Sequence, residues 1–236
     1  MRVSVFSGRS DDSLGRVAAV EAAVATAAEH RANMLVLPAY ALGSHEVDDT
    51  VLQRGAKETA MSILAEVGDN TFLYRPDRPR TCLLSQQFCT AADATHDKVR
   101  AVADAIREGS RTIEVGDKRV AVLLCGENNS LRNVRNERNT PIGRFSDIPW
   151  PLECYDVLVN PAHTSMGHWN LLHLRFAYFS QAGRVAVYCA NNTHERWKSS
   201  LCVYRNGVKV LTGDLDEVIE CPHRIEKDWR LVTLDV

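Results

Sequence analysis

Apolar runs and stretches with helical periodicity alternate at the start of the chain. Residues Val3–Ser7 form a short apolar run, residues 14–31 carry apolar side chains at helical spacing, and residues 34–38 are apolar throughout. Apolar residues at every third or fourth position predict a helix, and a continuous apolar run is typical of a strand covered on both faces. The chain therefore opens as strand, helix, strand.

The same two patterns continue to the end of the chain. They predict helices at 57–67, 97–107 and 169–181, and strands at 71–74, 81–85, 111–115, 118–125, 156–160, 184–190, 201–204, 208–211 and 229–236. Asn206-Gly207 predicts a hairpin, because both residues tolerate positive φ. The polar stretch 128–147 is expected to be a solvated surface loop or helix edge. No low-complexity linker divides the sequence, so residues 1–236 are predicted to form one α/β domain.

The composition is typical of an ordinary soluble globular protein and indicates no particular reaction. The chain has 28 Lys and Arg against 30 Asp and Glu, a net charge of −2, and 45% hydrophobic residues. This near-neutral balance gives no electrostatic reason to expect a nucleic acid or a membrane as partner. No apolar stretch approaches a membrane span, and the first residues do not resemble a secretory signal. We therefore expect a cytoplasmic protein.

Seven cysteines are scattered along the sequence without a C-x-x-C pair. This pattern does not indicate a disulfide framework or a zinc site, and no metal or other cofactor is expected. Cys125 differs from the other six, which are expected to be small core residues, because it ends an apolar strand and precedes Gly126. A side chain at such a turn is presented at the carboxyl edge of a sheet, where open α/β proteins bind ligands. Glu127 and Asn128, which follow Gly126, are predicted to bind the ligand.

Several segments in order resemble the nitrilase, or carbon–nitrogen hydrolase, superfamily. They are AEHRANMLVLP, LLCGE, YDVLVNPAHTS, WNLLHLRFAYFSQAGRVAVYCANN and SSLCVYRNGVKVL. The resemblance covers nearly the whole chain and implies a four-layer α-β-β-α sandwich that pairs into homodimers or larger homo-oligomers. It also implies a small amide or nitrile as ligand and a Cys nucleophile, here Cys125, served by a Glu base and a Lys that stabilises the oxyanion. The helix Arg of the family corresponds to Arg175.

Two of the three catalytic identities are missing from the matching positions. Ala39 stands where the family has its Glu, and the stretch that should hold the Lys offers Gln86, with Lys98 as a later candidate. Three explanations stay open: a pseudoenzyme that binds or assembles, a divergent hydrolase with substitute residues, or an engineered substitution at Ala39. The leading hypothesis is a degenerate or repurposed homologue.

The alternative is an active amidase in which another residue acts as base. Glu46 follows Ala39 closely in sequence, and His163 follows the turn Asn160-Pro161-Ala162. A Cys125–His163 pair would reproduce the thiol–imidazole arrangement of many Cys hydrolases. In an active site, Cys125 is expected to have a lowered pKa and to be the most readily alkylated thiol of the chain.

Overall fold

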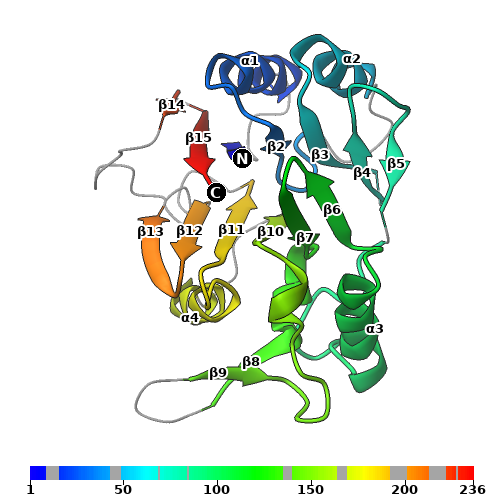
Figure 1. The fold of residues 1–236 in the computed structure, drawn as a ribbon, viewed down its shortest axis with the longest axis vertical. Coiled ribbons are helices and arrows are strands. Elements are labelled where there is room, and N and C mark those ends of the chain that lie inside the picture. Colours follow the sequence, from blue (N-terminus) through cyan, green and yellow to red (C-terminus); the bar gives the residue numbers. More distant parts are fainter. Residues whose placement is uncertain are drawn as a thin grey trace.

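The computed structural model places two β-sheets face to face, with helices outside both (Figure 1). It describes residues 1–8, 16–42, 49–68, 70–83, 85–134, 140–163, 169–191, 201–212, 222–226 and 228–236.

The first sheet has the strand order β14-β15-β1-β2-β3-β4-β5. Its strands are β1 (Arg2–Gly8), β2 (Met34–Val36), β3 (Ser62–Val67), β4 (Asn70–Tyr74), β5 (Thr81–Cys82), β14 (His223–Ile225) and β15 (Trp229–Asp235). The central strands β1, β2 and β3 are parallel, and antiparallel strands flank them on both sides. The carboxyl ends of the three parallel strands therefore lie along one edge of the sheet.

The second sheet has the order β13-β12-β11-β10-β7-β6. Its strands are β6 (Thr112–Val115), β7 (Lys118–Val122), β10 (Val157–Ala162), β11 (Val185–Ala190), β12 (Leu201–Arg205) and β13 (Val208–Thr212). Strands β7, β10 and β11 are parallel. The N–H of Leu123 still donates to the carbonyl of Val159 at 2.9 Å, so the chain leaves the sheet only just before Cys125.

Alternation of side chains along the strands produces the layers. One set of strand residues, including Val3 and Val122, forms a shared core between the two sheets. The opposite set in the first sheet packs under helices α1 (Arg16–Glu29) and α2 (Thr50–Thr59), and that in the second sheet under α3 (His96–Arg107) and α4 (Trp169–Phe179). The predicted four-layer α-β-β-α sandwich is confirmed (Figure 1).

The prediction of one helix over residues 57–67 is wrong. Helix α2 ends at Thr59, and Ala60 adopts a left-handed conformation with φ 53° and donates its N–H to the carbonyl of Ala56. The residues that follow form β3, which pairs parallel with β2 and antiparallel with β4. The apolar run Ile63–Ala65 fits a helix or a doubly covered strand equally well, and pairing with the sheet decides between them.

The prediction of a solvated loop over residues 128–147 is wrong in part. Asn128, Asn129 and Ser130 are buried. Two short antiparallel strands follow, β8 (Leu131–Asn133) and β9 (Pro141–Gly143), at the lower end of the molecule in Figure 1. The side chains of Asn128 and Asn129 are buried because the fold supplies hydrogen-bond partners for them, whereas the buried Ser130 hydroxyl has none among the described residues.

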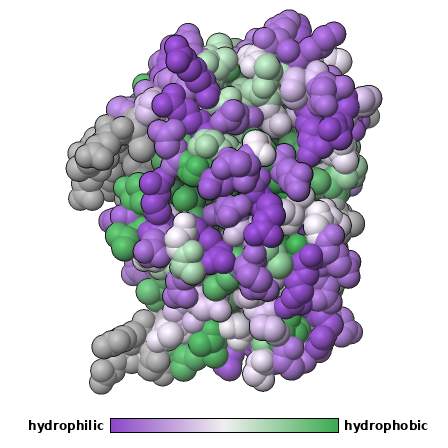
Figure 2. Space-filling model, viewed as in Figure 1, coloured by the Kyte–Doolittle hydropathy of each residue, from purple (hydrophilic) through white to green (hydrophobic). Residues whose placement is uncertain are grey.

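The remaining predicted elements appear with ends shifted by a few residues. The Asn-Gly hairpin is confirmed, with φ 49° at Asn206 and 79° at Gly207. Hydrophilic side chains cover most of the face seen in Figure 2, with hydrophobic residues scattered among them. None of the helices within the described ranges is both long and apolar enough to span a membrane.

Candidate active site

Cys125 begins a short 3-10 helix, η1 (Cys125–Ser130), just beyond the end of β7. Its φ is +40°, which is left-handed and unusual for a residue with a side chain. Such a conformation costs about 1–3 kcal/mol and persists only where the surroundings hold it. The polar groups around η1 supply that support.

Glu127 connects the turn to neighbouring segments through an ion pair and hydrogen bonds. Its carboxylate is fully buried and pairs through both oxygens with the guanidinium of Arg111, which is 2% exposed. It also accepts the backbone N–H of Leu124 at 2.8 Å and that of Gln87 at 2.7 Å. Burial raises the pKa of Glu127, while Arg111 and the two N–H groups oppose that shift. Glu127 thus joins β6, the end of β7 and the segment that contains Gln87.

Arg175 of α4 holds the turn from the other side. It donates to Asn128 Oδ1 at 2.9 Å and to Asn129 Oδ1 at 2.7 Å. Burial lowers the pKa of Arg175 to about 10, still well above neutrality, so the guanidinium stays charged. The carbonyl of Cys125 in turn accepts Asn128 Nδ2 at 3.0 Å and Asn160 Nδ2 at 3.1 Å. These bonds fix the backbone of the strained residue.

The segment around Gln86 lies directly against the turn. A Cβ on Gly126 would lie 1.7 Å from the carbonyl oxygen of Cys89, so only glycine fits there. Gln86 Nε2 donates to the carbonyl of Phe88 at 2.8 Å and lies 3.2 Å from Cys89 Sγ. The amide of Gln86 therefore stabilises its own loop beside the turn.

The Cys125 thiol is partly buried. Burial raises its pKa, the backbone N–H of His163 lowers it, and the Glu66 carboxylate raises it further. The net shift of the Cys125 pKa is upward, opposite to the lowered pKa expected of an active site. The thiol is held in its protonated form at neutral pH and needs a proton acceptor before it can act as a nucleophile.

Ala39 lies at the same site. Its side chain is buried, its N–H donates to the carbonyl of Ala162 at 3.2 Å, and its carbonyl accepts Asn191 Nδ2 at 2.8 Å. Ala162 immediately precedes His163, whose N–H is directed at the thiol. The end of β2 thus reaches the neighbourhood of Cys125 across the sheet interface.

The His163 side chain takes a different direction from its backbone. Its ring packs edge-on against Tyr40, with centroids 4.8 Å apart, and Tyr40 itself has φ +55°. Burial lowers the pKa of His163, and the charge of Arg16 lowers it further. The imidazole is therefore neutral at pH 7, and the contact of this residue with the thiol is made by its N–H.

The structure brings some predicted site residues together and leaves others apart. Cys125, Ala39, His163, Glu127, Asn128 and the Gln86 loop surround one turn, whereas Lys98 is exposed on α3 and Glu46 lies outside the described residues. Glu127 and Asn128, predicted to bind ligand, are fully buried, and their bonds described here go to the protein.

Sequence reasoning missed Arg111, Asn160, Asn191 and Glu66. Arg111 immediately precedes β6 and Asn160 lies within β10, two residues before the strand ends at Ala162. Polar residues are common near strand ends, so nothing in the sequence distinguishes these two. Glu66 carries a signal, because it is an ionisable residue within the apolar run of β3. That signal was lost when the run was assigned to a helix.

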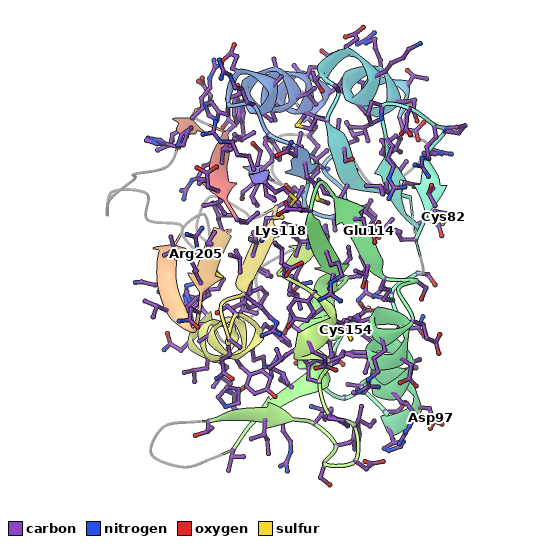
Figure 3. The ribbon with its side chains drawn as sticks, viewed as in Figure 1. Cys82, Asp97, Glu114, Lys118, Cys154 and Arg205 are labelled. Atoms are coloured by element: carbon purple, nitrogen blue, oxygen red, sulfur yellow. The ribbon has the colours of Figure 1, made fainter. Side chains whose placement is uncertain are left out.

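The other cysteines do not all lie in the core as expected. Cys189 and Cys202 are buried, but Cys82 and Cys89 are exposed and Cys154 is partly exposed. Figure 3 shows Cys82 on β5 at the periphery. Cys221 lies outside the described residues. Within the described ranges, no three His, Cys, Asp or Glu side chains are grouped as metal ligands.

Solved structures with this fold are found among carbon–nitrogen hydrolases. A CN-hydrolase superfamily protein from Xanthomonas campestris, with an arsenic adduct in its active site, is 12% identical with a TM-score of 0.63, over 100% of this chain and 90% of that one. A mutant amidase from Nesterenkonia sp., with acrylamide added at the active-site cysteine, is 12% identical with a TM-score of 0.57, over 100% and 93%. Nit3 of Saccharomyces cerevisiae, a nitrilase superfamily member, is 10% identical with a TM-score of 0.56, over 100% and 89%.

No family model and no curated protein matches the chain. At these identities the likeness concerns the fold. The chain therefore has the nitrilase-like fold of the carbon–nitrogen hydrolase superfamily.

Proposed function

We propose that this protein is a repurposed carbon–nitrogen hydrolase homologue in which Cys125 still accepts an acyl group from a small amide. The observation that carries the proposal is the state of Cys125. It is held at φ +40° on a turn braced by two buried guanidinium groups, with the N–H of His163 directed at its sulfur. A strained residue held from several sides is typical of a functional position.

The chemistry would be acyl transfer through a thioester. The sulfur attacks the amide carbon, the amine leaves, and water or another nucleophile then takes the acyl group. Ala39 and Gln86 supply neither a carboxylate nor a cation at the positions of the family's Glu and Lys, so we propose that these roles have been lost there. Loss of the family's cation at the position of Gln86 removes the charge that stabilises the oxyanion, and we expect slow turnover.

A catalytically silent binding protein is the second candidate. The upward shift of the Cys125 pKa favours it, because a buried protonated thiol is a poor nucleophile. In that case the residues around Cys125 would bind an amide-like ligand without forming a covalent bond.

Trapping of the acyl group separates the two candidates. The protein is incubated with a panel of small aliphatic amides and hydroxylamine, hydroxamate is measured, and the thioester is located by mass spectrometry of peptides. We expect slow hydroxamate formation, and an acyl mass on the peptide that contains Cys125.

Two variants control this experiment. Cys125→Ser should abolish both signals, while Cys82→Ser, at an exposed thiol on β5, should leave them unchanged. Amide binding without any acyl-enzyme or hydroxamate in the wild-type protein would support the silent binding protein and contradict acyl transfer.

A further inference from the structure

A carboxylate lies near Cys125 on a strand where the family resemblance places no catalytic residue. Glu66 belongs to β3 and is partly exposed. We propose that Glu66 is the proton acceptor and donor for Cys125, replacing from the end of β3 the carboxylate absent at Ala39. This inference rests on the proposed acyl transfer, which it deepens by naming the missing base.

The alternation of β3 places Glu66 between the two sheets. Leu64 belongs to the core shared by the sheets, whereas Ile63 and Ala65 pack in the cluster under α1 and α2. Side chains two residues apart on a strand point to the same face. Glu66 therefore faces the second sheet, which carries Cys125 at the end of β7.

The strand register places Glu66 at the level of the site. Val36 of β2 is paired with Leu64 of β3 in parallel, and the N–H of Leu37 donates to the carbonyl of Leu64 at 2.9 Å. Two residues beyond this pair, Pro38, which follows the end of β2, is level with Glu66 of β3. The carboxylate thus lies one strand away from Ala39, at the same carboxyl edge.

The negative charge of Glu66 raises the pKa of the Cys125 thiol. After burial and the His163 N–H, the Glu66 carboxylate has the largest effect on the pKa of Cys125, which it raises. Cys89 acts in the same direction, and Tyr188 is a further titratable neighbour whose pKa responds to Cys125. A carboxylate that raises a thiol pKa favours the protonated sulfur at rest, and its position on the face of β3 directed at the second sheet is the geometry from which it would receive that proton.

The proton balance of the reaction can be closed with this one carboxylate. As the sulfur bonds to the amide carbon, the S–H proton passes to Glu66. As the C–N bond breaks, the proton passes from Glu66 to the leaving nitrogen, which gives ammonia and a thioester. Water then attacks the thioester while Glu66 takes its proton, and the proton returns to the departing thiolate.

Glu66→Gln tests this role through two readouts that should move in opposite directions. Loss of the negative charge lowers the pKa of Cys125, so iodoacetamide should alkylate this thiol faster at neutral pH than in the wild-type protein. Loss of the base should slow acylation by amides by about 10²–10⁴-fold. A merely structural effect would move both rates together.

Two further variants complete the experiment. Glu114→Gln removes an exposed strand carboxylate on β6, labelled in Figure 3, and should change neither rate. Glu66→Asp keeps the charge on a shorter side chain, so it should retain the wild-type alkylation profile and acylate more slowly. If Glu66→Gln does not fold, Glu66→Asp still tests the base role through its acylation rate.

The outcomes are distinguishable. Alkylation of Cys125 in Glu66→Gln with the wild-type pH profile, or acylation at the wild-type rate, would overturn the role of Glu66 while leaving acyl transfer by Cys125 in place. Absence of an acyl-enzyme in the wild-type protein would contradict the proposed function itself, and the base role would fall with it even if the alkylation profile responded to the carboxylate.

Discussion

Removal of the Arg111 guanidinium tests the support of the active-site turn. In Arg111→Met, Glu127 keeps its two backbone N–H partners but loses both bonds to the cation, and the carbonyl of Ser85 loses a donor at 2.8 Å. Both members of the pair are almost completely buried. Breaking a buried ion pair from one side costs about 3–5 kcal/mol, because the remaining charge stays desolvated.

The loss should depend on pH. With the cation gone, burial is left to raise the pKa of Glu127 above the ordinary value of about 4.3. Between that value and the raised one, the folded variant binds more protons than the unfolded chain, so its stability falls as pH rises. The deficit relative to the wild-type protein should therefore be larger at pH 8 than at pH 5.

Urea unfolding at the two pH values measures this. At pH 8 we expect the free energy of unfolding of Arg111→Met to fall by about 3–5 kcal/mol. The matched control is Arg119→Met, which removes a half-exposed ion pair with Asp156 and should cost less than about 1 kcal/mol. A deficit of Arg111→Met as small as that of the control, or equal at both pH values, would refute the reasoning.

Two further predictions concern the same turn and the thiols around it. In Gly126→Ala the new Cβ meets the Cys89 carbonyl oxygen, so unfolding in urea should show a loss of about 1–3 kcal/mol together with loss of acylation. Gly143→Ala, with 3.4 Å to its nearest neighbour, should change little, and equal stability of the two variants would contradict the clash. Time-resolved alkylation followed by peptide mass spectrometry should label Cys82 and Cys89 before Cys125, and Cys189 and Cys202 only on unfolding. Because its pKa is raised, Cys125 labelling should still increase above pH 8.5, and a plateau near neutrality would contradict that shift.

The layers of this fold were predictable because they depend on short-range patterns. Doubly buried strands such as β11 read as continuous apolar runs, and the Asn206-Gly207 turn has few alternatives to a hairpin. The run Ile63–Ala65 was ambiguous, since its type depends on pairing with β2, which is distant in sequence.

The site was predictable only at its centre. Cys125 was predicted as a site residue because it ends an apolar strand and is followed by glycine. The residues that hydrogen-bond to its turn come from segments distant in sequence. Arg175 reaches Asn128 from 47 residues away, and Asn160 reaches the Cys125 carbonyl from 35 residues away. The upward shift of the Cys125 pKa was not predictable from the sequence, because burial and the charge of Glu66 depend on the packing of the two sheets.

The central claim is that Cys125 accepts an acyl group. The most direct measurement is the mass of the peptide that contains Cys125 after incubation of the wild-type protein with a small aliphatic amide and rapid acid quenching. The account predicts an added acyl mass on that peptide, absent in Cys125→Ser and removed by hydroxylamine. An unmodified Cys125 under conditions in which the amide is bound, or an acyl group on Cys89 in its place, would contradict it.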